Sequence, residues 1–239
     1  MRYLLGASAI LGLVCLLWWN LPKTQNFVLT AKMNTPIGER SATVIRQLSF
    51  ENLVTFGLNL TEISVTQAGE ALVLPIEDRP SVFVLMNKQG RGALAMLAAA
   101  MTEVPGYPHP RSRVSVWHWP RQIDETNRAF PVPKKNHPTF VIFGDEGDRN
   151  SIRVLDDENF ARNFDEGYDF PELSVQFTDA KVSLGRIREL LPWPGKVSGG
   201  FQPPHESTKK ALSLPRPFFD HFVRETSRSN SEIRFGGGV

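Results

Sequence analysis

Two tryptophans that flank a histidine are the side chains of this chain with the clearest binding chemistry. Trp117 and Trp119 lie on either side of His118, and alternate side chains of an extended strand point to the same face. Two indoles on one exposed face can stack on sugar rings or form an apolar patch that receives a partner. The alternative is that they cover the core beneath a proline-rich segment. We take Trp117 and Trp119 as candidate binding residues.

The sequence carries no pattern typical of catalysis or metal binding. A zinc site needs ligands at short fixed offsets, and a serine hydrolase of the common type needs a Gly-x-Ser-x-Gly turn. The five histidines show no such spacing and are interpreted as solvent-exposed: His109, His118, His137, His205 and His221. We therefore predict no catalytic residue, no metal site and no cofactor. A serine, a histidine and a carboxylate that meet only in the fold stay open, because such triads are recognised by geometry.

Charge is distributed unevenly along the chain. The net charge is +2, yet the segment 145–172 holds ten acidic residues against three arginines, a net charge of −7. The remaining, basic part could meet anionic lipid headgroups. No basic stripe is interleaved with aromatic residues, so nucleic acid is not expected as a partner. The run Asp145-Glu146-Gly147-Asp148 lacks the distal glutamate of an EF-hand loop and is interpreted as a solvated acidic turn.

The amino-terminal residues are the most apolar part of the chain. No charged residue lies between Tyr3 and Trp19, and a helix of this length rises about 25 Å, close to the thickness of a bilayer's hydrocarbon core. The run does not end in the small residues of a signal-peptidase site. We predict an uncleaved transmembrane anchor over residues 1–22 that contacts the lipid bilayer through residues 3–19. A lipid-modified Cys15 is the alternative.

An anchor of this kind also predicts a location. Short amino-terminal anchors usually leave the large domain outside the cytoplasm, and a single cysteine excludes an internal disulfide without excluding an oxidising compartment. We predict a single-pass protein of the bacterial inner membrane with its main domain in the periplasm.

After the anchor we predict one α+β domain over residues 23–197, followed by a Gly/Pro/Ser-rich tail over 198–239. Hydrophobic residues make up 41% and charged residues 22% of the chain, a globular composition. Period-two alternation between turn residues favours a mainly antiparallel sheet with one or two packed helices. Strands are expected at 27–33, 41–50, 62–66, 71–74, 81–86, 114–119, 139–143, 151–155 and 172–177, and helices at 92–104, 157–164 and 183–191. The first two strands are expected to form a hairpin, the strands up to residue 86 one meander, and 139–143, apolar on both faces, a central strand. Asp156 and Ser183 are expected to begin the second and third helices.

Two segments resemble a family of uncharacterised proteobacterial single-span membrane proteins. They are FVLTAKMNTPIGERSATVIRQ, directly after the anchor, and NFDEGYDFPELSVQFTDAKVSLGRIRELLPW, near the end of the domain. Together they cover about a quarter of the chain. At Ala180-Lys181-Val182 the chain departs from the family pattern, which commonly carries a proline in this turn. The resemblance implies placement in the cell envelope and offers no activity or site residue.

These observations favour a membrane-anchored envelope protein that acts as a binding or interaction module for another envelope protein or a polymer. The alternative is a membrane-anchored hydrolase with a site assembled from distant residues. The positions of His109, His118 and His137 in the fold distinguish the binding module from the hydrolase. A histidine bonded to a carboxylate at the floor of a cleft would favour the hydrolase.

Overall fold

In the computed structural model, the residues that the structure describes are 23–53, 62–86, 92–102, 128–193, 223–224 and 232–233. The predicted anchor, the segment that carries Trp117 and Trp119, and all the histidines except His137 lie outside these ranges. Within them, no helix is long and apolar enough to cross a membrane.

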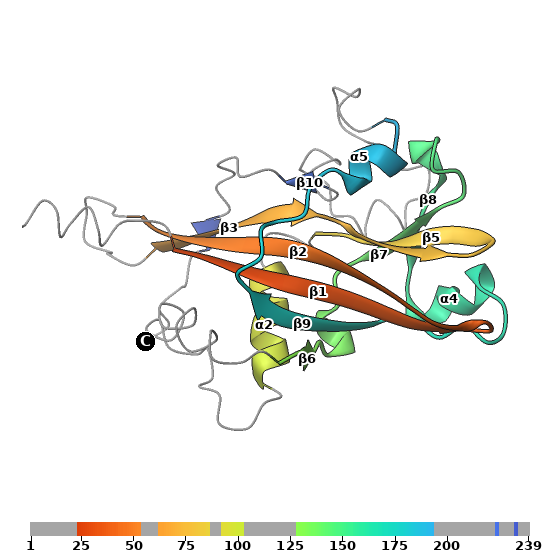
Figure 1. The fold of residues 1–239 in the computed structure, drawn as a ribbon, viewed down its shortest axis with the longest axis horizontal. Coiled ribbons are helices and arrows are strands. Elements are labelled where there is room, and N and C mark those ends of the chain that lie inside the picture. Colours follow the sequence, from red (N-terminus) through yellow and green to blue (C-terminus); the bar gives the residue numbers. More distant parts are fainter. Residues whose placement is uncertain are drawn as a thin grey trace, which may run out of the picture.

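Two antiparallel sheets pack against each other (Figure 1), which confirms the predicted mainly antiparallel α+β fold. The larger sheet has the order β10-β3-β2-β1-β9-β6, and β11 also pairs with β3. Its strands are β1 (Lys23–Thr35), β2 (Gly38–Leu53), β3 (Glu62–Glu70), β6 (Phe130–Pro131), β9 (Glu172–Thr178), β10 (Val223–Arg224) and β11 (Glu232–Ile233). The smaller sheet has the order β4-β5-β7-β8, formed by β4 (Leu72–Ile76), β5 (Arg79–Val84), β7 (Phe140–Phe143) and β8 (Ile152–Leu155).

Short helices complete the fold. They are α2 (Gly92–Thr102), α4 (Asp157–Asn163) and α5 (Arg186–Leu190), with the 3-10 turns η1 (Lys134–Asn136) and η2 (Arg149–Ser151). Asp156 caps α4 as predicted, because its side chain accepts from the backbone N–H of Asn159. The predicted acidic turn is also confirmed, since Asp145 and Asp148 accept from backbone N–H groups two residues further on.

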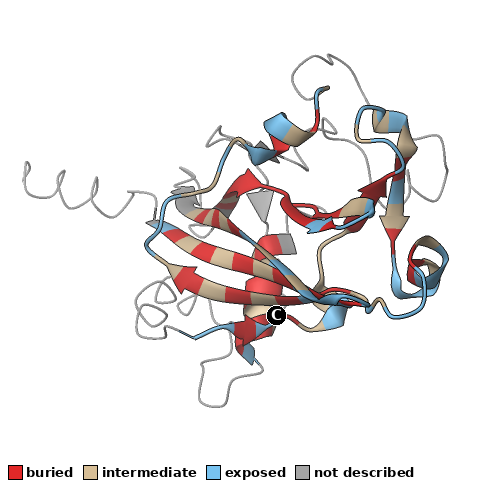
Figure 2. Cartoon of the chain, turned by 45° about the vertical axis from the view of Figure 1, so that its right-hand side comes forward, coloured by how far each residue is buried: buried red, intermediate tan, exposed pale blue. Residues whose placement is uncertain are grey.

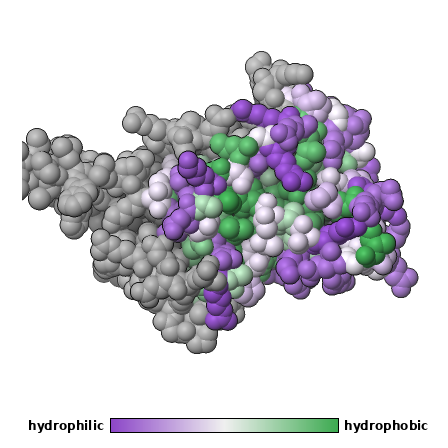
Figure 3. All heavy atoms as spheres, in the orientation of Figure 1, coloured by the Kyte–Doolittle hydropathy of each residue, from purple (hydrophilic) through white to green (hydrophobic). Residues whose placement is uncertain are grey.

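The predicted hairpin of β1 and β2 is the framework of the larger sheet. Its register runs without a shift from Lys23 opposite Phe50 to Thr35 opposite Gly38. Burial alternates along both strands (Figure 2), with Phe27 and Leu29 fully buried. The buried face packs on α2 and on the smaller sheet. On the outer face, hydrophobic side chains lie at the centre of the view in Figure 3, and the right-hand end is mainly hydrophilic.

The smaller sheet is buried on both faces. One face joins the main core between the sheets, and the other packs on α5 through Phe83, Val141 and Ile187. Strand β7, with all four residues buried, lies between β5 and β8. This placement confirms the prediction of a central strand at 139–143, because a strand covered on both faces is apolar throughout.

Three details differ from the prediction. The early strands divide between two sheets instead of forming one meander, because the chain turns away from β2 near the end of β3, at Gly69, whose φ is +131°. Helix α5 begins at Arg186 and not at 183, because Ser183 bonds to β2 instead of capping the helix. The described residues of the carboxy-terminal tail form β10 and β11, two strands that the sequence did not predict.

Candidate functional site

Strand β2 is longer than the strand beside it, and this difference creates an open edge. Strand β3 pairs only with Gln47–Leu53, because the chain turns away at Gly69 towards the smaller sheet. In the part of the chain that the structure describes, no strand pairs with residues 38–46 of β2 on that side. We call residues 39–43 of β2 the open edge.

The backbone groups of the open edge point away from β1. Ile45 donates its N–H to the Ser183 hydroxyl at 3.2 Å and accepts the Ser183 N–H at 3.1 Å. Both groups of Ile45 are therefore directed outward. In a regular antiparallel ladder the groups of every second residue point to the same side. Glu39, Ser41 and Thr43 thus present a row of donors and acceptors that continues, beyond the open edge, into the pair of bonds between Ile45 and Ser183.

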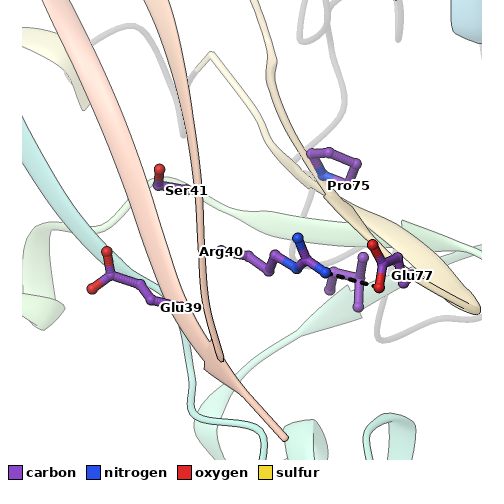
Figure 4. A pocket seen from close by; sticks show the side chains of 6 residues that line it. Glu39, Arg40, Ser41, Pro75 and Glu77 are labelled. Atoms are coloured by element: carbon purple, nitrogen blue, oxygen red, sulfur yellow. Dashed lines mark ion pairs between the residues drawn. The ribbon is translucent and has the colours of Figure 1, made fainter. Parts of the chain in front are cut away.

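A cleft lies where the open edge faces the smaller sheet. It has a volume of about 350 Å³ and is lined by Glu39, Arg40, Ser41, Pro75, Ile76 and Glu77. Figure 4 shows the Arg40 side chain reaching from β2 to Glu77, with 2.8 Å between Nη2 and Oε2. Arg40 and Glu77 are exposed by 36% and 64%. At such exposure the pair contributes little to stability, so a ligand can displace it at small cost.

The opposite wall of the cleft is an edge strand of a different kind. Strand β4 carries the exposed Pro75, and its pairing with β5 shifts between Leu74 and Ile76. Proline has no N–H to donate, and a bulge interrupts a ladder; both are devices by which edge strands avoid pairing. The cleft therefore has one edge that can accept a strand and one that is blocked.

A buried arginine lies further along β2, outside the cleft lining. The Arg46 side chain is fully buried and donates to the carbonyl oxygens of Glu70 at 3.0 Å, Val84 at 2.8 Å and Leu85 at 3.4 Å. Burial lowers the pKa of Arg46 to about 9, and the nearby Glu70 charge opposes this shift. These contacts join β2 to the ends of β3 and β5, so Arg46 fixes the angle at which the two sheets diverge.

Glu70 extends this network to α5. Its Oε2 accepts from the backbone N–H groups of Gly185 and Ile187, both at 3.1 Å. Because Ser183 and Gly185 belong to one short segment, the segment that bonds β2 at Ile45 also bonds Glu70, the residue whose carbonyl accepts from the buried arginine. This network was not predicted from the sequence. The available signal was that Arg46 occupies an inward position among Ala42, Val44 and Leu48.

Of the five histidines, His137 alone lies among the described residues. Its side chain is half-buried, so the expectation that it is solvent-exposed is wrong. Its Nε2 lies 3.0 Å from the carbonyl oxygen of Val132, and its ring packs against Phe140. Burial lowers the pKa of His137, with smaller effects of nearby charges. Its Nδ1 is buried, and no hydrogen bond joins the ring to a carboxylate within the described ranges. His137 lies outside the cleft lining.

The lining of the cleft brings together one hydroxyl group, one guanidinium group and two carboxylates. The Ser41 hydroxyl has no histidine beside it in the lining, and the two carboxylates of the lining form ion pairs with Lys32 and Arg40. Across the described residues, no group of three or more His, Cys, Asp or Glu side chains is placed to hold a metal ion. The candidate residues Trp117 and Trp119 lie outside the described ranges and do not contribute to this description.

Comparison with known proteins gave no match to a family model, to a curated protein or to a solved structure.

Proposed function

We propose that this chain is a membrane-anchored binding module of the bacterial envelope, which takes up an extended segment of a partner protein along the open edge of β2. Strand addition of this kind gains affinity from main-chain hydrogen bonds and specificity from pockets for alternate side chains. The observation that carries the proposal is the row of outward backbone groups at Glu39, Ser41 and Thr43 beside a cleft.

The position of the open edge relative to the predicted anchor supports the same function. Strand β1 begins at Lys23, directly after the apolar run, and Thr30 of β1 lies opposite Thr43 of β2. Seven residues of extended chain span about 23 Å. If residues 1–22 form the predicted anchor, the hairpin separates the open edge from its end by about this distance, which supports access by another envelope protein.

Site-specific photo-crosslinking in bacterial membranes tests this function. A photoreactive residue replaces the exposed Thr43 at the open edge or, as a matched control, the exposed Arg153 on β8 at the edge of the smaller sheet. We expect a protein partner to be captured from position 43 and not from position 153. Adding Ser41→Pro should abolish capture, because proline removes an outward N–H without removing a bond to β1.

Two results would contradict the proposal. One is capture from position 43 that persists unchanged with Ser41→Pro in a folded protein. The other is recovery of the protein alone, together with a hydrolase activity that is lost when one histidine is changed. The Ser41→Ala variant, which keeps the N–H, controls for loss of the side chain.

A further inference from the structure

The two hairpins that border the cleft end beside one acidic segment. Asp169 donates its N–H to the Asn34 carbonyl at 3.1 Å and accepts from Asn34 Nδ2 at 2.9 Å, which ties the segment to the β1–β2 turn. Asp165 forms an ion pair with Arg79 at the β4–β5 turn. The segment 165–169 therefore bridges both turns. We call residues 32–40, 77–79 and 165–169 together the mouth of the cleft.

The charges of the mouth are unbalanced. It holds six carboxylates and three cations, a net charge of −3. Each cation already has a carboxylate partner in the pairs Lys32–Glu39, Arg40–Glu77 and Arg79–Asp165. Among the residues that the structure describes, no cation pairs with the exposed carboxylates of Asp78, Glu166 and Asp169.

We propose that the partner segment is basic: an extended stretch whose backbone pairs with residues 39–43 and whose Lys or Arg side chains meet the mouth. This inference rests on the proposed function. A strand that pairs with the open edge and continues past Glu39 runs towards the turn at Pro36, beside which Gly167 lies. Five paired residues span about 17 Å, so the next residues of the partner reach the acidic carboxylates.

The geometry sets the pattern of the partner's side chains as well. Alternate residues of an added strand point to opposite faces. One set would face Arg40 and the apolar wall at Pro75 and Ile76, where small or apolar side chains fit without bringing a second cation to Arg40. Basic side chains therefore belong at the mouth end of the segment and not inside the cleft.

Selection from a displayed library of random peptides tests the inference on the full-length chain in nanodiscs. Enriched peptides are measured against three forms of the protein. The first is the unchanged chain. The second carries Asp78→Asn, Glu166→Gln and Asp169→Asn, and the third carries Asp145→Asn, Asp179→Asn and Glu189→Gln, an equal loss of exposed charge away from the mouth.

We expect the enriched peptides to carry net positive charge and to bind the second form about threefold to tenfold more weakly than the third. Binding should also weaken as salt is raised, because exposed charges are screened. N-methylation should abolish binding when it is placed on one set of alternate peptide residues and not when it is placed on the other, since only one set of N–H groups faces β2.

The possible failures are distinguishable. Peptides that Ser41→Pro no longer binds, but that show no positive charge and no difference between the second and third forms, would overturn the basic partner and leave strand addition standing. If no enriched peptide depends on Ser41 or on the parity of N-methylation, both the basic partner and the proposed function are wrong.

Discussion

The two walls of the cleft are both strand edges, and they treat an incoming strand in opposite ways. Strand β4 carries Pro75 and a shift in register, and β2 runs through residues 38–46 with neither. Exposed regular edges invite unwanted pairing, and proteins generally block them. The contrast between a blocked edge and a regular one is what the proposed strand addition to β2 requires.

The largest expected effect comes from removing the arginine that holds the two walls in position. Arg46→Ala leaves the carbonyls of Val84 and Glu70 without their donor and the buried Glu70 without its compensating charge. Breaking a buried ionic network from one side costs about 3–5 kcal/mol. Urea denaturation measures this loss, with the exposed Arg153→Ala as control. A loss below about 1 kcal/mol would show that Arg46 does not hold the sheets together.

A smaller loss is expected at the residue where β3 leaves β2. Gly69 has a φ of +131°, and a Cβ there would lie 3.0 Å from Arg46 Cγ. Gly69→Ala should therefore destabilise the fold by about 1–3 kcal/mol. Gly144→Ala is the matched control, because a Cβ at Gly144 meets nothing closer than 3.6 Å and its φ is not positive. Equal stability of the two variants by thermal denaturation would contradict this account of the turn.

The difference between the two edges can be tested by introducing a proline into β2 and removing the proline of β4. Ser41→Pro should weaken binding of an extended peptide by at least about tenfold and remove detectable capture, through loss of an edge hydrogen bond and the bulk of the ring. Pro75→Ala should leave binding within about twofold, because the shift between Leu74 and Ile76 still interrupts β4. Fluorescence anisotropy with one labelled peptide compares them. A larger loss of affinity in Pro75→Ala than in Ser41→Pro would mean that the peptide pairs with β4 and not with β2.

The smallest expected effect is a pH dependence of the free energy of unfolding that peptide binding does not share. Burial lowers the pKa of His137 in the folded chain, so below pH about 6.5 the unfolded chain binds more protons than the folded chain. Stability is fully present above that pH and falls as the pH decreases towards the folded pKa. His137→Gln should remove this part of the slope in urea titrations between pH 5 and 8. A slope identical in both proteins would rule out His137 as its source.

The same series tests the placement of the site. His137 is not part of the cleft lining, so peptide binding to the folded protein should not follow its titration. If binding instead follows the titration of His137, the binding site lies close to His137 and not at the cleft.

Much of the fold is predictable because its signals are local. The alternation over 27–33 and 41–50 with the intervening turn predicted the hairpin, and Asp156 predicted the start of α4. The unbroken apolar run over 139–143 predicted a central strand, since only a strand covered on both faces needs no polar side chains.

The division into two sheets and the open edge were not predictable in the same way. Both depend on a turn at one glycine, Gly69, and on the different lengths of β2 and β3. The alternation of apolar and polar residues predicts neither of these features. The start of α5 was misplaced because Ser183 satisfies the backbone of Ile45, a residue 138 positions earlier in the chain. Non-local contacts of this kind override a local capping signal.

Amide hydrogen exchange along β2 tests the open edge most directly. The account predicts an alternating pattern in the free protein: the amides of Glu39, Ser41 and Thr43 exchange fast, and those of Arg40 and Ala42, which face β1, exchange slowly. A bound extended peptide should slow the first set and leave the second unchanged. Uniform protection of residues 39–43 in the free protein, or no added protection on binding, would contradict the account.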